Sequence, residues 1–166
     1  IDRQAGRHML GHPAHQRRRV GRHAWRSRKD SRIVGRLVVA DPDNDPAWIA
    51  ADLLVQAEHD TAAQSILMTT DAAFADAVEQ AVQKQLETLP RAEIASASWR
   101  DFGAVILLNS LEEAPALIDR IAPEHLELAT DAAEKLVLKI RNAGAVFIGR
   151  YTPEALGDYV AGSNHV

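Results

Sequence analysis

The chain has 166 residues, 46% of them hydrophobic, and a formal net charge of -4, which is enough for one soluble domain with its own core. It contains no apolar run long enough to span a membrane and no secretion signal, so we expect no membrane partner and a cytoplasmic location. Because it has no cysteine, disulfides and thiolate metal sites are excluded, and any metal would be bound by histidine, carboxylate or amide oxygen.

The charge is unevenly distributed along the chain. Residues 1–40 contain eleven Lys or Arg against two Asp, whereas the remainder is strongly acidic. Residues 1–36 also show no apolar periodicity, so we treat them as a separate segment that is disordered or lies outside the original reading frame. A basic arm that binds nucleic acid is the alternative. We do not favour it, because lysine is scarce and Trp25 is the only aromatic residue there for base stacking.

From residue 36 onward, short apolar runs alternate with longer amphipathic segments. Asp45 followed by Pro46 is a helix start signal, and Asp71 is a second helix cap. We predict strands at 36–40, 65–70 and 103–109, helices at 46–60, 71–89, 110–123 and from 131 to near residue 144, and a last strand directly after that. This alternation predicts an α/β fold with a mainly parallel, layered sheet, part of a Rossmann-like domain over 37–166.

Three groups of polar residues stand out as candidate sites. Gln56 and His59 are three positions apart on one stripe of a helix and could bind one metal ion, although a polar helix end is the simpler interpretation. Glu124 and His125 follow a proline, which could direct both side chains into one pocket as a base and an acid, although such pairs are also common on surfaces. The sequence ends on "GDYVAGSNHV", where Asp158 could bind a metal or cap a turn.

Taken together, "VQAEHD", "IAPEHLEL" and "NAGAVFIGRYTPEALGDYVAGSNHV" occur in the order and spacing of one family. Over about residues 37–166 the chain resembles histidinol dehydrogenase. Members of this family are zinc-dependent, NAD-linked homodimers of histidine biosynthesis. They oxidise L-histidinol through the aldehyde to L-histidine.

The resemblance implies a role for each of the singled-out residues. It implies that Gln56, His59 and Asp158 are zinc ligands and that His165 contacts the substrate. It also implies that Glu124 and His125 are the catalytic pair, with His125 taking the alcohol proton and Glu124 activating water. We expect the three zinc ligands to converge, because the helix ending near residue 60 and the loop after residue 150 should meet at one end of the sheet.

The chain also departs from the family pattern. The stretch "IVGRL" stands where the family has a "GPSE" turn with a substrate-contacting serine, and no G-x-G-x-x-G loop identifies the cofactor-binding residues. The family continues beyond "SNHV" to a fourth zinc ligand and a substrate-binding glutamate. We therefore expect an interior piece of a longer enzyme that is inactive alone. The alternatives are a degenerate product without function and a non-enzymatic α/β binding protein whose basic arm binds nucleic acid.

Overall fold

The computed structural model describes residues 18–19, 35–58 and 60–152. Within these residues the chain forms one sheet of six strands in the order β1-β4-β3-β2-β5-β6, and every neighbouring pair is parallel. The strands are β1 (Arg18–Arg19), β2 (Arg36–Ala40), β3 (Ser65–Thr69), β4 (Ala104–Leu107), β5 (His125–Ala129) and β6 (Ala145–Ile148). The helices are α1 (Pro46–Ala57), α2 (Ala72–Leu86), α3 (Ala92–Phe102), the 3-10 turn η1 (Leu111–Glu113), α4 (Ala114–Ile121) and α5 (Ala133–Val137).

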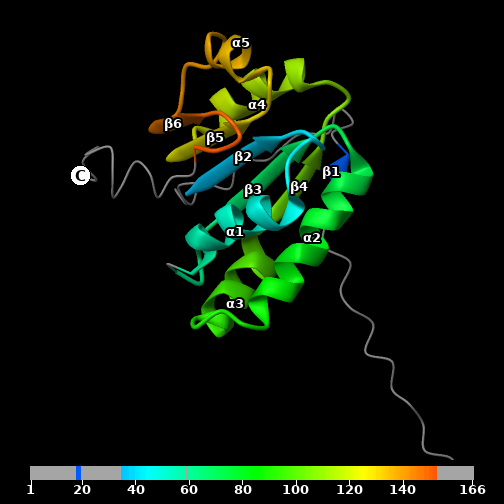
Figure 1. The fold of residues 1–166 in the computed structure, drawn as a ribbon. Coiled ribbons are helices and arrows are strands. Elements are labelled where there is room, and N and C mark those ends of the chain that lie inside the picture. The colour runs from blue at the N-terminus through cyan, green and yellow to red at the C-terminus, as the bar shows by residue number, and fades with distance from the viewer. Residues whose placement is uncertain (1–17, 20–34, 59, 153–166) are drawn as a thin grey trace, which may run out of the picture.

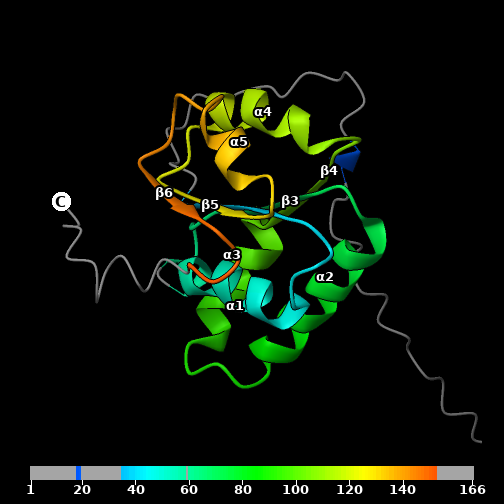
Figure 2. The same cartoon turned by 45° about the horizontal axis from the view of Figure 1, so that its top comes forward.

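The strand order explains why helices cover both faces of the sheet. From β2 the chain adds β3 and β4 on one side, and it then returns to add β5 and β6 on the other side of β2. Parallel crossovers are almost always right-handed, so this change of direction moves the connecting helices to the opposite face. Figures 1 and 2 show α1, α2 and α3 on one face and α4 and α5 on the other.

Alternating residues of the central strands supply two separate cores. Val38 and Ala40 of β2 belong to the cluster under α1, α2 and α3, whereas Leu37 and Val39 belong to the cluster under α4 and α5. All four are fully buried. Residues 37–40 are thus all apolar, and their side chains alternate between the two faces of the sheet. This is the pattern of a strand covered on both faces.

The α/β class, the parallel sheet and most of the expected elements are confirmed. The strand at 36–40 has the predicted bounds. Both predicted caps form, because Asp45 accepts a hydrogen bond from the Ala47 amide at 2.8 Å and Asp71 accepts one from the Phe74 amide at 2.7 Å. Each bond satisfies a donor that a helix start leaves unpaired.

Three details differ from the expectation. Helix α3 and strand β5 are not among the elements predicted from the sequence. The helix predicted from 131 to near 144 is only the five-residue α5. In α3, Ala95 and Trp99 lie one helical turn apart, and both are buried. This spacing of apolar residues is the sequence signal that indicates the helix. Beyond α5 the backbone is not helical, although Ile140 and Ala143 still pack against the core.

The ordered sheet begins slightly before the expected domain boundary. Arg36, the last residue of the segment assigned as separate, is the first residue of β2 and is 1% exposed. Arg18 and Arg19 pair with Ile106 and Leu107 of β4, and the rest of 1–34 lies outside the described residues. Across the described ranges, no helix is long and apolar enough to cross a membrane.

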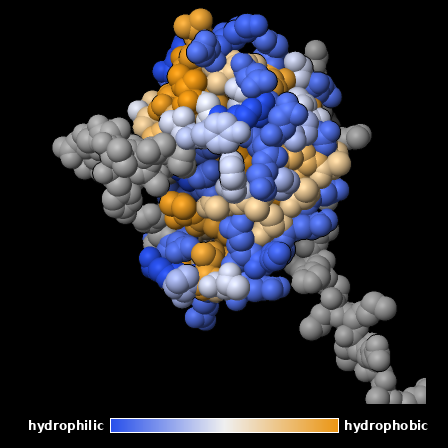
Figure 3. Space-filling model, viewed as in Figure 1, coloured by the Kyte–Doolittle hydropathy of each residue, from blue (hydrophilic) through white to orange (hydrophobic). Residues whose placement is uncertain are grey.

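Apolar side chains gather at the β6 edge of the molecule. Leu138 is 86% exposed, and Val146 and Ile148 of β6 are about 40% exposed. In Figure 3 an orange group marks apolar surface at the upper left, where Figure 1 places α5 and the loop that leads to β6. Side chains on the central strands are buried by comparison, so apolar surface is exposed at this edge of the sheet.

We expect Leu53→Ala to lower the free energy of unfolding by about 2–5 kcal/mol, because Leu53 lies on the buried face of α1 and its truncation leaves a cavity. Val55→Ala on the same helix is the matched control, since Val55 is 45% exposed and should lose less than about 1 kcal/mol. Urea denaturation of both variants measures the difference. Equal losses would contradict this account of the core.

Candidate functional site

The three candidate residues that the structure describes, Gln56, Glu124 and His125, lie along the amino edge of the sheet, where the strands begin. His125 is the first residue of β5, Glu124 directly precedes it, and Gln56 lies at the end of α1, which runs back to this edge from the carboxyl edge. Arg36 begins β2 and pairs in register with His125. The Arg36 guanidinium donates a hydrogen bond to the Asp52 carbonyl of α1 and lies 3.7 Å from the Asp52 carboxylate.

The backbone of the neighbouring strands fixes the position of His125. Its amide donates to the Gly35 carbonyl at 2.9 Å, and its side chain is 7% exposed. Leu126 packs in the core on the α4 side, so the alternation of the strand directs His125 to the α1 side. There its ring meets Phe147 of β6 edge to face, with centroids 6.2 Å apart.

Gln56 reaches the same place from α1. Its side chain lies directly against Gly35, where an added Cβ would be 2.3 Å from the Gln56 Nε2 atom. Gly35 is therefore in contact with Gln56 through its Cα and bonded to His125 through its carbonyl. The structure thus brings two of the predicted site residues to one glycine, on the same face of the sheet.

Glu124 lies in a bend between α4 and β5. Its side chain is exposed, whereas Pro123 before it and His125 after it are buried. The Glu124 carbonyl accepts a hydrogen bond from the Ala145 amide at 2.8 Å, and the Pro123 carbonyl accepts one from the Gly144 amide at 3.0 Å. The backbone of Glu124 is therefore held by hydrogen bonds from the β6 segment. The backbone of His125 is held from the other side, by the segment that leads into β2.

Three predicted site residues, His59, Asp158 and His165, lie outside the described residues. Inside the described ranges, no group of three His, Asp or Glu side chains could hold a metal ion. The loop that leads to Asp158 starts at the carboxyl edge after β6, and Tyr151 then packs on Trp48 of α1 with ring centroids 5.9 Å apart. The convergence of the three expected zinc ligands stays a prediction.

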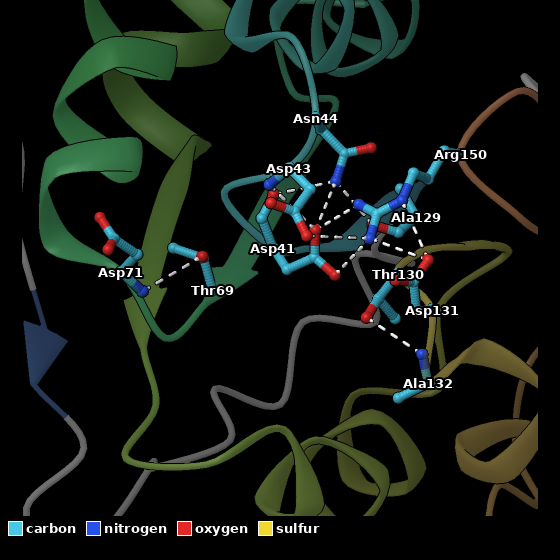
Figure 4. Close-up of polar contacts among 10 residues, drawn as sticks. All are labelled: Asp41, Asp43, Asn44, Thr69, Asp71, Ala129, Thr130, Asp131, Ala132 and Arg150. Carbon is cyan, nitrogen blue, oxygen red and sulfur yellow. Dashed lines mark hydrogen bonds and ion pairs between the residues drawn. The ribbon is translucent and has the colours of Figure 1, made fainter.

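A second polar cluster, which the sequence analysis did not identify, lies at the opposite, carboxyl edge. Figure 4 shows Arg150 between carboxylates from two other loops. It forms a two-pronged ion pair with Asp41 after β2, with one bond at 2.9 Å, and lies 3.0 Å from Asp131 after β5. Asp43 is 3.6 Å away. The Asn44 amide joins the same loops by donating to the Ala129 carbonyl at 2.8 Å.

This cluster, formed by Asp41, Asp43, Asp131 and Arg150, stands between β2 and β5, where the strand order reverses. Such switch points bind ligands in many open α/β sheets, but here an internal ion pair fills the position. Burial raises the pKa of Asp41, but hydrogen bonds from Arg150 and Thr130 and the charge of Arg150 outweigh it and lower that pKa overall. The hydrogen bond to Asp41 raises the pKa of Arg150 in turn.

The sequence signals for these features were weak. An aspartate after a strand and an arginine after a glycine are common in loops, and only the strand order brings Asp41 and Arg150 together across 109 positions. Gly35 and Gly144 were visible as glycines beside strands. Their role as contact points for Gln56 and Glu124 depends on the sheet register, which the sequence does not reveal.

The amino edge can support proton transfer. His125 carries an imidazole that can accept or donate a proton, and Glu124 places a carboxylate in solvent directly beside it in the chain. Gln56 adds an amide oxygen, which is a possible metal ligand. The carboxyl edge, by contrast, has its charges paired with one another and serves to join loops.

Comparison with known proteins gives one consistent result. A model of the family described as histidinol dehydrogenase matches residues 35–166. The chain is 70% identical over 130 residues to a histidinol dehydrogenase of Rhizobium meliloti and 69% identical over 130 residues to one of Brucella suis. Each alignment covers 78% of this chain and 30% of the relative.

The fold comparison agrees with the sequence comparison. A crystal structure of histidinol dehydrogenase from Elizabethkingia anophelis matches with a TM-score of 0.76 and 41% identity. The match covers 81% of this chain and 31% of that one. The chain therefore spans about 30% of the length of the relatives it matches.

We expect Asp41→Asn to lower the free energy of unfolding at pH 7 by about 1.5–3 kcal/mol, the usual range for hydrogen bonds to charged groups. Because the folded pKa of Asp41 is lowered, its contribution is present above the unfolded pKa, about 3.9, and is lost as the pH falls through the lower folded value. The variant should therefore lose less stability than the unmodified chain below about pH 4.

Urea denaturation between pH 7 and pH 3 measures this dependence. Glu87→Gln, which neutralises an exposed carboxylate at the end of α2, is the control and should follow the unmodified chain. If Asp41→Asn also followed it at every pH, the ion pair with Arg150 would not stabilise the fold.

Proposed function

We propose that this chain, which belongs to the histidinol dehydrogenase family, contributes part of an active site that oxidises L-histidinol through the aldehyde to L-histidine with NAD. The family match over residues 35–166 supports this proposal, as does the 70% identity to a curated relative. The observation that carries it in the structure is the meeting of Gln56 and His125 at Gly35, with Glu124 adjacent in the chain.

The proposed chemistry assigns one proton transfer to each member of the pair. His125 takes the hydroxyl proton of histidinol while the hydride leaves the carbinol carbon, which gives the aldehyde. Glu124 takes a proton from the water that adds to the aldehyde, and the resulting hydrate loses the second hydride to give the acid. Each of the two oxidations would consume one NAD, which accepts the hydride when bound.

Burial suits the two residues to these different tasks. His125 is 7% exposed and lies against Phe147, so a substrate that reaches it leaves bulk water behind. Glu124 is exposed at the same edge, where solvent supplies the water of the hydration step. The buried imidazole thus serves the oxidation that excludes water, and the exposed carboxylate serves the hydration that needs it.

The donor set of Gln56, His59 and Asp158 suits zinc. Imidazole nitrogen and carboxylate oxygen are the usual zinc ligands, and the Gln56 amide oxygen would be a third, less common donor. The three would hold the ion where it would orient the amino alcohol and imidazole of the substrate. The chain from Tyr151 to Asp158 is long enough to bring Asp158 to Gln56. Tyr151 lies on Trp48, and seven residues can extend up to about 23 Å from there. The helix rises only about 12 Å from Trp48 to Gln56.

We expect the chain to bind Zn²⁺, and Gln56→Ala to weaken that binding by about tenfold or more, since even outer-shell partners of metal ligands contribute ten- to a hundredfold. Isothermal titration with Zn²⁺ measures the affinity. Gln80→Ala, on the exposed side of α2, is the matched control and should bind as the unmodified chain does. Equal affinity of the Gln56 and Gln80 variants would remove Gln56 from the proposed site.

We also expect the chain alone to show no steady oxidation of histidinol. In the family a fourth zinc ligand and a substrate-binding glutamate come from a segment that this sequence does not contain. Misplacement of a substrate by about 1 Å can cost roughly a hundredfold in rate. The assay follows NADH absorbance with histidinol, NAD and Zn²⁺, with a Glu124→Gln, His125→Asn double variant as the blank. Turnover that the double variant abolishes would show a working enzyme and contradict this expectation.

A further inference from the structure

The loop before β6 makes an unusually close contact with the backbone of Glu124. A Cβ added at Gly144 would lie 2.5 Å from the Glu124 carbonyl oxygen and 3.3 Å from both its carbonyl carbon and its Cα. All three atoms belong to the backbone, so no side-chain rotation could relieve the overlap. Only glycine allows the two segments to approach this closely.

From this contact we propose that Gly144 is a positioning residue for the Glu124–His125 pair. The inference rests on the proposed function, because it takes that pair as the catalytic one. Gly144 touches neither side chain. It acts through the backbone, by letting the β6 segment come close enough to hold the peptide groups on either side of Glu124.

Three backbone hydrogen bonds show what the close approach permits. The Gly144 amide bonds the Pro123 carbonyl at 3.0 Å, the Ala145 amide bonds the Glu124 carbonyl at 2.8 Å, and the His125 amide bonds Gly35 on the other side at 2.9 Å. The backbone at Glu124 is therefore fixed from both neighbouring strands. Its exposed side chain starts from a rigid base, as a proton-transfer group requires.

The conformation of Ala122 supports the same interpretation. Ala122 ends α4 with φ 52° and ψ 65°, in the left-handed region that a non-glycine residue adopts at a cost of about 1–2 kcal/mol. This turn leads directly into Pro123 and Glu124. In the described part of the chain, Ala122 is the only non-glycine residue with positive φ, and its strain is sustained by the bonds that follow.

A methyl group at residue 144 would force a measurable displacement. Moving the Cβ from 2.5 Å to at least 3.0 Å from the Glu124 oxygen separates the segments by about 0.5 Å. That is the limit within which a catalytic constellation must be held. Gly144→Ala should therefore lengthen the bonds to Pro123 and Glu124 and shift both members of the pair.

The test compares Gly144→Ala with Gly103→Ala by NMR of the full chain. Gly103 is a matched control because its added Cβ would also lie 2.5 Å from a backbone oxygen, that of Trp99, at the far end of α3. Both variants should lose stability. Only Gly144→Ala should shift the imidazole signals of His125, assigned with His125→Asn, and the amide signals of Glu124 and His125. Equal or absent shifts in the two variants would overturn the proposal.

A measurement on the unmodified chain keeps the proposal testable if Gly144→Ala does not fold. The amides of Gly144, Ala145 and His125 should exchange with solvent at least about a hundredfold more slowly than unstructured amides, as ladder bonds do. Fast exchange of the first two would overturn the proposal. Addition of histidinol and Zn²⁺ distinguishes failure of the proposed function from failure of the role of Gly144. If the His125 signals do not shift with either addition while amide exchange stays slow, the proposed function is contradicted, but Gly144 keeps its role as a backbone contact.

Discussion

The pairing of β5 with β2 is the constraint on which the rest of the structure depends. The chain builds β2, β3 and β4 in one direction and then places β5 on the free side of β2, in register from Arg36 opposite His125 to Ala40 opposite Ala129. At its start this pairing sets His125 beside Gly35 and thus beside Gln56. At its end it sets Asp131 beside Asp41, where Arg150 joins both.

The two edges of the sheet consequently have different roles. The carboxyl edge at the reversal of strand order, a usual ligand position, contains an ion-paired cluster that ties the loops after β2, β5 and β6 together. The amino edge carries one exposed carboxylate, that of Glu124, and one buried imidazole, that of His125. The ion-paired carboxyl edge fixes where the chain leaves β6, and Tyr151 then packs on Trp48 of α1.

Much of the fold could be predicted from the sequence because local signals were strong. Asp45 with Pro46, and Asp71, predicted helix starts that form as expected, and the apolar run at 36–40 predicted a strand that forms with those bounds. The strand His125–Ala129 was missed because a proline precedes it and its sequence contains charged residues, which is typical of a turn. The strand is nevertheless buried along its whole length, between its neighbours β2 and β6. Most candidate residues stood out as polar groups in the sequence, and the resemblance over the whole motif set supplied their roles. Their placement depended on sheet register, as did the contacts of Gly35 and Gly144, and no local pattern encodes register between distant strands.

The central claim is that the site lies at the amino edge, with Gln56 as one metal ligand. Anomalous scattering from a crystal of the chain soaked with Zn²⁺ tests it most directly. The account predicts a peak about 2.0–2.2 Å from the Gln56 amide oxygen, at the distance of a zinc–oxygen bond. A peak at the carboxyl edge among Asp41, Asp43 and Asp131, with none near Gln56, would contradict it.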